Sequence, residues 1–352
     1  EELGRTTTVR HRIETGNDRP VKQPPRRVPV QQQRTVEEAL ERMRRAGVIQ
    51  ESESPWSSPM VVVTRMDGTT QFCVDYRKLN EITQTPTRLL PKIEDCTEAL
   101  GGHRFFSTLD LASGCWQVEI APEDRPKTAF NTRSGLYEFC VMPFGLATAT
   151  QTFERLMGVA MEGIQWERCL IYLDDIVTMG RHFDDAMDGL RQVLTRLRKA
   201  GLKVEAARCR LLQDSITVFG HEIRQEGVRC GTENVRAVRE MSAPRNLMEV
   251  KTFLGFVSYY RKFIRDFARL AEPLQVLMTR ETRFTWTDAQ QRAFEALRRP
   301  LTQSPLLIHP QLDDEFILDT DASGAAIGGV LSQERDGVEH VVAYASEALH
   351  GP

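Results

Sequence analysis

Two adjacent carboxylates interrupt an apolar stretch, LIYLDDIV, at residues 170–177. Each flank has the length and composition of a β-strand, so the stretch predicts a hairpin with Asp174 and Asp175 at its tip. Paired charges in apolar surroundings are costly unless something compensates them, and Mg²⁺ prefers such carboxylate oxygens. The alternative is an ordinary turn that happens to use aspartate, because so short a motif also matches by chance. The rest of the chain decides between the two.

The 352 residues allow two or three domains, and a hydrophobic content of 41% allows a sizeable core. The formal net charge of -3 excludes a basic field over the whole molecule, although 46 lysines and arginines leave room for local basic patches. None of the 7 cysteines forms a C-x-x-C pair, which argues against a zinc site and a disulfide framework. No apolar run reaches membrane-span length and no signal-peptide core is present, so we expect no membrane partner.

Residues 1–34 are polar and rich in proline and basic residues, which predicts an extended N-terminal arm. This arm either packs along a domain, touches phosphates or is a solvated leader. A helix is expected to start at Thr35, where TVEE forms a capping box, and to end at Gly47. Two strands, 60–64 and 71–75, flank the turn signal Asp67-Gly68.

Cations surround that hairpin: Arg65 precedes the turn, and Arg77 and Lys78 follow the second strand. A hairpin of this kind could clamp a triphosphate. Taken alone, an ordinary solvated hairpin is the better interpretation.

The middle of the chain alternates between strand and helix patterns. Residues 105–111 predict a strand that carries a carboxylate, Asp110, near its end. Leucines and a methionine at spacings of three and four predict an amphipathic helix over 182–200, with Met187, Leu190, Leu194 and Leu197 on its apolar face. Further strands are expected at 116–120 and 136–142, a further hairpin with strands at 218–223 and 227–228, and a further helix at 149–161.

The C-terminal part becomes helical from 234 to 279, with Asn246 as a helix cap. The cluster YYRKFIR at 259–265 mixes aromatic and basic side chains, which suits contact with a nucleic-acid backbone and equally suits a helical core with a charged rim. A helix is expected from 286 to about 301, and strands at 316–323, 327–332 and 341–344. The last strands predict the start of a further domain that is truncated at residue 352.

Asp110 and the Asp174-Asp175 pair converge if their strands are neighbours in one sheet. Converging carboxylates can hold two Mg²⁺ ions about 3.5–4 Å apart, the arrangement used for in-line phosphoryl transfer. The protein then contributes positioning and electrostatics and little covalent chemistry.

Four motifs occur in order and at suitable separations: VDYRKLN at 74–80, LDLASG at 109–114, MPFGL at 142–146 and YLDD at 172–175. Together they resemble the reverse transcriptase of gypsy-class LTR retrotransposons, the RNase H-linked part of Pol. FLGFVSYYRKF at 253–263 resembles the family's thumb-side signature, and DTDAS at 319–323 resembles the start of its RNase H domain. The resemblance covers nearly the whole chain.

The resemblance implies an α+β fold, a right-hand polymerase with fingers, palm and thumb, followed by the start of an RNase H-like domain. It divides the chain into an arm at 1–34, fingers and palm at 35–228, a helical thumb at 229–285 and a truncated RNase H-like domain at 286–352. The implied activity is RNA-directed DNA polymerisation from a primer on an RNA or DNA template. RNase H activity is not expected, because the family's other metal-binding carboxylates lie further downstream.

The resemblance also implies roles for individual residues. Asp110, Asp174 and Asp175 would be the catalytic triad that binds Mg²⁺ or Mn²⁺, and Asp321 would be the first RNase H metal ligand. Nucleotide binding would involve Arg65, Gln71, Cys115, Phe144 and Gly145, with Arg65 over the incoming triphosphate. Nucleic-acid binding would involve Gly220, His221, Tyr260, Arg261 and Lys262, with Gly220 and His221 near the primer end.

Four positions depart from the family pattern. Gln71 stands where the family usually has arginine, and Cys115 where it has an aromatic ring, commonly tyrosine, under the sugar. Thr148 and Thr150 replace the usual asparagine and proline. The intact triad favours an active polymerase, whereas the substituted pocket favours a decayed or domesticated copy that binds nucleic acid with little polymerase activity. Both remain open from the sequence.

The implied partners are an RNA template, a DNA primer–template and deoxynucleoside triphosphates. An oligomer within a polyprotein or a virus-like particle is expected, in the cytoplasm or also in the nucleus.

Overall fold

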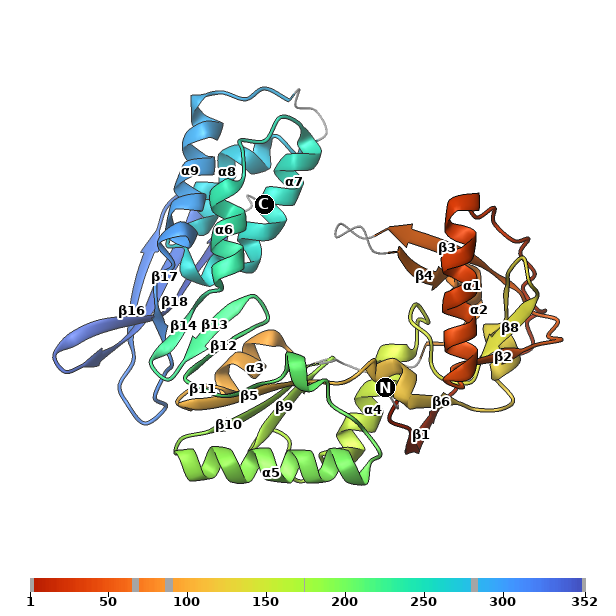
Figure 1. The fold of residues 1–352 in the computed structure, drawn as a ribbon. Helices are drawn as coiled ribbons and strands as arrows, with labels where there is room; N and C mark the ends of the chain where they lie inside the picture. Colours follow the sequence, from red (N-terminus) through yellow and green to blue (C-terminus); the bar gives the residue numbers. More distant parts are fainter. Residues whose placement is uncertain (1–2, 65–69, 86–90, 174, 280–283, 350–352) are drawn as a thin grey trace. The chain divides into compact units, whose positions relative to one another are not determined.

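The computed structural model describes residues 3–64, 70–85, 91–173, 175–279 and 284–349 (Figure 1). The chain divides into two units: Glu1–Pro91 with Ser107–Leu212, and Lys92–Phe106 with Gln213–Pro352. The four-part division expected from the sequence stays a prediction. Arg65, the Asp67-Gly68 turn and Asp174 lie outside the described residues. No helix in the described part of the chain is long and apolar enough to cross a membrane.

The first unit contains a five-stranded sheet against which helix α1 packs. The sheet has the order β2-β8-β7-β3-β4, and α1 buries Val36, Leu40 and Met43 in a core shared with it. Antiparallel pairing of Thr64 with Thr70 and of Met60 with Val74 confirms the hairpin expected from the sequence. The bounds are α1 Val30–Arg45, β2 Ile49–Glu51, β3 Ser58–Thr64, β4 Thr70–Val74, α2 Arg77–Ile82, η2 Arg125–Thr128, β7 Phe130–Asn131 and β8 Leu136–Phe139.

Helix α1 begins five residues earlier than expected. Its first residue is Val30, after Pro29, and Thr35 lies inside the helix, so the predicted capping box is wrong. The residues from Val30 to Arg34 include no helix breaker, and proline is the first residue upstream that lacks a backbone N–H. The predicted end is confirmed: Gly47 has φ +64°, and its N–H donates to Arg44 O (3.0 Å) while that of Val48 donates to Met43 O (2.9 Å).

The N-terminal segment is part of this unit's structure. Strand β1, Thr6–His11, pairs in parallel with β6, Val118–Ile120. His11 and Ile13 are fully buried, and the Ile13 N–H donates to Asp124 Oδ2 at 3.1 Å. Residues 6–13 of the arm therefore pack along a domain and are not a solvated leader.

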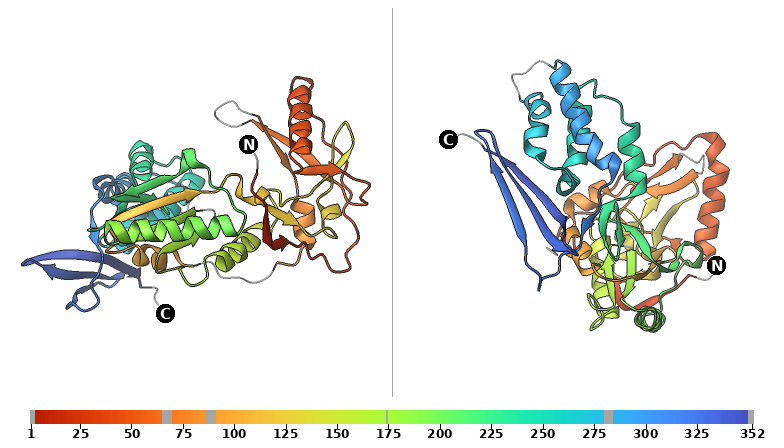
Figure 2. Two further views of the ribbon diagram at one scale, coloured as in Figure 1. Left: turned by 60° about the horizontal axis from the view of Figure 1, so that its bottom comes forward. Right: turned by 90° about the vertical axis from the view of Figure 1, so that its left-hand side faces the viewer.

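A four-stranded sheet with the order β11-β5-β10-β9 forms the floor of the candidate site. Helix α5 packs on it along β10, and α4 packs beside β9 (Figures 1 and 2). On α5, Val193 is buried and Leu194 is exposed. The prediction that Leu194 lies on the apolar face is therefore wrong. The bounds are β5 Phe105–Asp110, α4 Ala149–Ala160, β9 Cys169–Tyr172, β10 Asp175–Gly180, α5 Phe183–Lys199, η3 Ala206–Arg208 and β11 Arg210–Gln213.

Two predicted strands are interrupted. Trp116 and Gln117 belong to a 3-10 helix, η1 Gly114–Gln117, and only residues from Val118 onward form β6. Buried Gln117 donates to Ala112 O (2.8 Å) and Lys203 O (2.9 Å), which satisfies its amide in this non-strand position. The predicted strand 218–223 is a tight hairpin, because the chain reverses at Phe219 and Gly220.

The second unit combines helices with two sheets. The β12-β13-β14-β15 sheet and the β16-β17-β18 sheet are antiparallel, and the second of them confirms the strands expected at 316–323, 327–332 and 341–344. Asn246 caps its helix with a side-chain hydrogen bond, as predicted. Thr287 also caps its helix with a side-chain hydrogen bond, and this helix begins at Asp288, two residues after the expected start at 286. The bounds are α3 Ile93–Ala99, β12 Ser215–Val218, β13 His221–Arg224, β14 Gly227–Cys230, α6 Thr232–Glu240, α7 Leu247–Tyr259, η4 Arg261–Phe263, α8 Phe267–Val276, α9 Asp288–Gln303, β15 Leu307–Ile308, β16 Ile317–Ala322, β17 Ala326–Arg335 and β18 Val338–Ala348.

Candidate active site

Strand β5 lies beside β10 in the four-stranded sheet, which is the condition for the carboxylates to converge. Asp110 is the last residue of β5, and Asp175 is the first residue of β10. Both side chains are accessible to solvent. Their oxygens are the hard donors that Mg²⁺ prefers. Because Asp174 is not among the described residues, the three-carboxylate site stays a prediction.

The hairpin tip is closed by the pairing of Tyr172 with Asp175. Only Leu173 and Asp174 lie between them, so the loop has two residues. Leu173 has φ +54°, a left-handed conformation that costs a leucine about 1–2 kcal/mol. Two-residue hairpins require positive φ in the turn, and glycine or asparagine is the usual solution. Backbone strain at this position is therefore tolerated by the fold.

Arg208 forms an ion pair with Asp110. Its Nη1 lies 3.3 Å from Asp110 Oδ2, and the Glu205 N–H donates to Asp110 O at 2.8 Å. These contacts join η3 and the preceding loop to the end of β5. Sequence analysis did not identify Arg208, because the pair spans about a hundred residues and no local pattern marks it.

Cys115 and Phe144 frame the region expected to bind the nucleotide. Cys115, in η1, is partly buried and packs against the core beneath the sheet. The Phe144 ring is exposed and lies 6.3 Å from the Trp116 ring, centroid to centroid. Phe144 is thus exposed, whereas Cys115 is partly buried.

Asn80 holds the MPFGL turn from both sides. Its Nδ2 donates to Gly145 O (2.8 Å), and its Oδ1 accepts from the Ala147 N–H (2.9 Å). Gly145 itself has φ +91°, which favours glycine. The sequence showed Asn80 only as the last letter of a motif and gave it no role.

Three further positions near the expected nucleotide site differ in their surroundings. Gln71 pairs with Val63 in the β3–β4 ladder, but its side chain is outside the described part. Thr148 caps α4 without a side-chain hydrogen bond, and its buried Oγ1 has no partner. Thr150 is exposed on the first turn of the same helix.

The cations after β4 are neutralised within the unit. Arg77 donates twice to Asp75, at 2.8 and 2.7 Å, and Lys78 pairs with Glu81 at 2.8 Å. Hydrogen bonds from Arg77 lower the pKa of Asp75 to about 2. Because Arg77 and Lys78 are paired with carboxylates, the structure agrees with the interpretation of them as part of an ordinary solvated hairpin.

In the second unit, a single carbonyl organises the β12–β13 turn. Phe219 and Gly220 both have positive φ, +53° and +74°, as a type I′ turn requires. Gly220 O accepts from three donors: the Gly231 N–H (2.8 Å), Asn234 Nδ2 (3.1 Å) and Tyr260 Oη (3.1 Å). A Cβ at Gly220 would lie 2.4 Å from Tyr260 Oη, so only glycine fits.

The α7 end covers this turn with aromatic rings. Tyr259 Oη donates to Phe219 O at 2.6 Å, and the Tyr259 ring stacks on His221 at 5.4 Å. His221 is buried, and burial lowers its pKa to about 3, with the positive charge of Lys262 acting in the same direction. Arg261 is exposed, whereas Lys262 is partly buried. The structure thus brings together the five residues expected to bind nucleic acid.

Asp321 lies on β16, is exposed and pairs with Gly328. Among the described residues, which exclude Asp174, no three His, Cys, Asp or Glu side chains are arranged to hold a metal ion. The role of Asp321 as a metal ligand stays a prediction.

Comparisons with known proteins agree with this geometry. Residues 64–223 match the family "Reverse transcriptase (RNA-dependent DNA polymerase)", and residues 286–352 match the "RNase H-like domain found in reverse transcriptase". The chain is 33% identical over 356 residues to the retrovirus-related Pol polyprotein from transposon 297 of Drosophila melanogaster, covering 99% of the chain and 33% of the relative. It is also 32% identical to the transposon Tf2-3 polyprotein of Schizosaccharomyces pombe, covering 83% of the chain and 22% of the relative.

Solved structures share the fold. A foamy viral protease-reverse transcriptase in complex with dsDNA has a TM-score of 0.86 at 22% identity, covering 99% of this chain and 73% of that one. The same protein in complex with an RNA/DNA hybrid has a TM-score of 0.82 at 22% identity, covering 99% of this chain and 47% of that one. The chain spans about a third of the length of the Pol polyproteins from transposons 297 and opus that it matches. It belongs to the reverse transcriptase family, with an RNase H-like domain after the polymerase domain, as in the Pol polyproteins of gypsy-class and other LTR transposons.

Proposed function

We propose that this chain is an RNA-directed DNA polymerase that extends a primer on an RNA or DNA template by two-metal phosphoryl transfer. The observation that carries the proposal is the adjacency of β5 and β10, whose ends bear Asp110 and Asp175. Two carboxylates on neighbouring strands, each accessible to solvent, fit a divalent cation and a polyphosphate substrate.

Asp110, Asp174 and Asp175 would hold Mg²⁺ or Mn²⁺. Such ions, when bound, lower the pKa of the attacking hydroxyl and neutralise charge on the departing pyrophosphate. Asp110 and Asp175 come from different strands, so the sheet itself fixes their spacing. Arg208 Nη1 lies 3.3 Å from Asp110 Oδ2, so Arg208 would compete with a bound ion for this carboxylate.

Deoxynucleoside triphosphates and a primer–template are the proposed substrates. The relatives of known structure were solved with RNA/DNA hybrid and with dsDNA. In this chain, the Phe219-Gly220 turn, held by Tyr259 and Tyr260, is the proposed contact with the primer end. Exposed Arg261 adds a cation suited to phosphate.

A second candidate is a decayed copy that binds nucleic acid with little polymerase activity. The favouring observation is the nucleotide region, where Cys115 is small and the buried Thr148 hydroxyl has no partner. An unsatisfied buried hydroxyl group costs about 1–3 kcal/mol of stability. This cost indicates that threonine at position 148 is not optimised for the fold.

The test is primer extension by the purified chain on poly(rA)·oligo(dT) with Mg²⁺ or Mn²⁺, beside Asp110→Asn. Extension by the parent that falls by orders of magnitude in Asp110→Asn supports the polymerase. Duplex binding without extension supports the decayed copy, and extension by the variant at the parental rate contradicts the metal assignment.

A further inference from the structure

Helices α6 and α9 of the second unit form a recess of about 420 Å³. Its described lining is one residue of α6, Arg239, and four residues of α9: Glu295, Arg298, Arg299 and Thr302. The spacing of three, four and seven residues from Glu295 places these four on one face of α9. Small-molecule sites usually enclose roughly 300–1,000 Å³, so the recess has room for a small ligand.

Packing fixes the two helices against each other. Val238 on α6 and Leu297 on α9 are fully buried where the helices pack. Arg298 links the helices further, because its Nη1 donates to Met241 O, at the end of α6, at 3.3 Å. Its guanidinium carbon also lies 5.1 Å from the centre of the Phe294 ring. The Arg298 guanidinium group is therefore oriented before a ligand binds, which lowers the entropic cost of binding.

Cations outnumber carboxylates among the described residues that line the recess. The arginines Arg239, Arg298 and Arg299 stand beside one carboxylate, Glu295. Glu295 is exposed, and it accepts a hydrogen bond from Gln291 Nε2 at 2.7 Å. The net positive charge of the lining favours an anion.

Two of these arginines have no counter-charge. In the described part of the chain, the side chains of Arg239 and Arg299 form no hydrogen bond or ion pair, and both are exposed. By contrast, Arg292 on the same helix donates to Asp288 O at 3.2 Å. A guanidinium group binds phosphate oxygens through paired N–H donors, so these two arginines suit a phosphate group.

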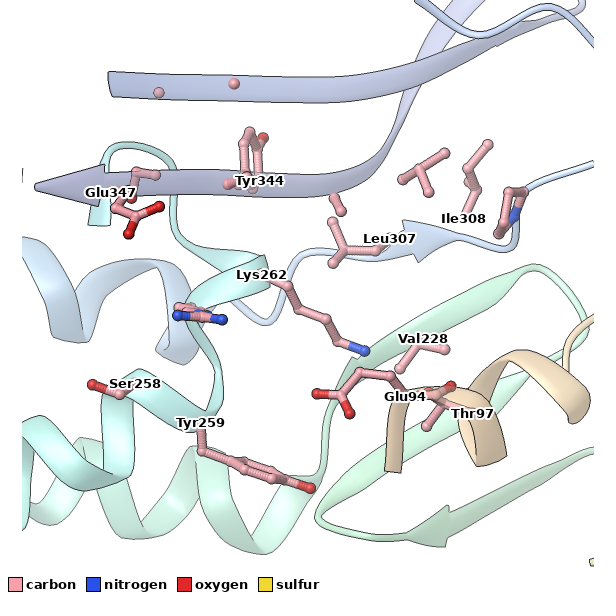
Figure 3. A pocket seen from close by; sticks show the side chains of 18 of the residues that line it. Glu94, Thr97, Val228, Ser258, Tyr259, Lys262, Leu307, Ile308, Tyr344 and Glu347 are labelled. Carbon is pink, nitrogen blue, oxygen red and sulfur yellow. The ribbon is translucent and has the colours of Figure 1, made fainter. Parts of the chain in front are cut away.

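The larger hollow of the second unit has the opposite balance of charge. Its volume is about 1180 Å³, and Lys262 extends toward Glu94 in it (Figure 3). Glu94 and Glu98 attract this ammonium group. Among the described residues of its lining, the cations Arg261 and Lys262 are outnumbered by the carboxylates Glu94, Glu98, Asp321 and Glu347. The recess between α6 and α9 therefore favours an anion, whereas the larger hollow does not.

We propose that the recess binds a compact anion with several phosphate charges, as in inorganic tripolyphosphate or the triphosphate tail of a nucleotide. Three arginines in one recess match several charges on adjacent phosphates. They match a nucleic-acid backbone less well, because each phosphodiester there carries one charge. The proposal does not depend on the polymerase function, because no residue of the recess belongs to the carboxylate site or to the nucleic-acid contact proposed above.

The probe for the test is tripolyphosphate, titrated calorimetrically into the purified chain at low ionic strength after a chelating resin has removed divalent cations. Without these cations, the carboxylate site cannot hold the probe through a metal. The parent should bind one equivalent. Arg239→Gln and Arg299→Gln should each weaken binding severalfold, and the double variant should raise Kd by at least about tenfold, the equivalent of 1.4 kcal/mol.

Arg292→Gln is the matched control, because it removes an exposed arginine of α9 that does not line the recess. It should bind tripolyphosphate as the parent does. The substituted arginines are exposed, so all variants should keep the parental thermal unfolding midpoint. Tripolyphosphate should raise this midpoint in the parent and in Arg292→Gln but not in the double variant, because only a bound ligand stabilises the folded state.

Two further probes define the chemistry. Dimethyl phosphate carries one charge, as a backbone phosphodiester does, and should bind at least about tenfold more weakly than tripolyphosphate. Binding of dATP as tight as that of tripolyphosphate would identify a nucleotide tail as the ligand. Weaker binding of dATP would assign the recess to inorganic polyphosphate, and both results support the proposed phosphate chemistry.

Three results would overturn the proposal. The first is equal affinity of the parent and the double variant for tripolyphosphate. The second is an equal loss in Arg292→Gln and Arg299→Gln, which would indicate a diffuse field and not a site. The third is displacement of tripolyphosphate by one equivalent of a single-stranded oligonucleotide, which would assign the recess to a nucleic-acid backbone. None of these measurements involves primer extension, so failure of this proposal is distinguishable from failure of the polymerase proposal.

Discussion

Arg208 and a divalent cation compete for the same carboxylate, Asp110. The ion pair is 3.3 Å long and solvent-accessible on both sides, and pairs of this kind contribute about 0.2–1 kcal/mol. Arg208→Gln should therefore lower the Mg²⁺ concentration for half-maximal primer extension, by up to about fivefold. The measurement is extension rate against Mg²⁺ concentration at saturating nucleotide. Arg210→Gln is the matched control, because Arg210 is an exposed arginine on β11. An increase in the Mg²⁺ requirement of Arg208→Gln would show that Arg208 assists metal binding instead.

Thr148 carries a hydroxyl group that is buried and has no hydrogen-bond partner. Thr148→Val keeps the shape of the side chain and removes the unsatisfied group, so the free energy of unfolding should stay unchanged or rise by up to about 1–3 kcal/mol. Urea unfolding of both proteins measures the difference. Thr150→Val, at an exposed position on the same turn, should change stability little. A loss of stability in Thr148→Val would mean that the hydroxyl group has a partner in solution.

Cys115 occupies the position where the family resemblance implies an aromatic ring under the sugar. A ring there excludes a 2′-hydroxyl by steric contact, and the smaller Cys115 side chain leaves part of that volume open. Ribonucleotides should therefore be incorporated with weaker discrimination than in Cys115→Tyr, whose preference for dATP over ATP should be at least about tenfold greater, since 1.4 kcal/mol is tenfold in rate. The measurement is kcat/KM for both nucleotides in both proteins. Equal and strong discrimination in the two proteins would assign the sugar selection to another residue.

At the scale of elements, the β12–β13 turn depends on hydroxyl groups from α7. Tyr260→Phe removes one of three donors to Gly220 O, and Tyr259→Phe removes the donor to Phe219 O. Each variant should lose about 0.5–1.5 kcal/mol of unfolding free energy. The double variant should lose less than the sum of the two single losses if the two bonds hold one turn cooperatively, because losing either bond already weakens the other. Chemical denaturation of the four proteins tests this, and an additive double variant would mean that each tyrosine acts independently.

Local patterns predicted the elements but not their long-range partners. The hairpin at residues 170–177 and the caps at Asn246 and Thr287 were predictable, because their signals lie within a few residues. The start of α1 was missed because a capping-box pattern also occurs inside a helix. The Phe219-Gly220 turn was missed because residues 218–223 were interpreted as one strand. The Arg208–Asp110 pair and the three donors to Gly220 O join distant segments, and no local sequence pattern encodes such contacts.

At the scale of the whole molecule, each unit buries a neutral histidine. His11 in the first unit is fully buried, with Nδ1 2.9 Å from Thr152 Oγ1, and desolvation lowers its pKa to about 4 despite the attraction of Asp124. His221 in the second unit is shifted in the same direction, to about 3. Carboxylates with a lowered pKa, such as Asp75 at about 2, lose their contribution to stability mainly at a pH below the range in which the histidines act.

These histidines predict how stability depends on pH. An unfolded histidine titrates near pH 6.5, so below that value the unfolded state binds protons that the folded state excludes. The contribution of the neutral histidines to the free energy of unfolding is complete above about pH 6.5. It falls progressively down to about pH 4 for His11 and about pH 3 for His221, because the unfolded state binds more protons and is therefore favoured as the pH falls.

The measurement is the free energy of unfolding from urea titrations between about pH 7 and pH 5, a range set by the ordinary pKa of histidine. His11→Gln can keep a hydrogen bond to Thr152 but cannot titrate, so its stability should decline less steeply than that of the parent. His182→Gln, at an exposed histidine, should follow the parent. Equal slopes for the parent and His11→Gln would mean that His11 is already protonated in the folded chain, and the buried histidine would then be held as a cation by Asp124.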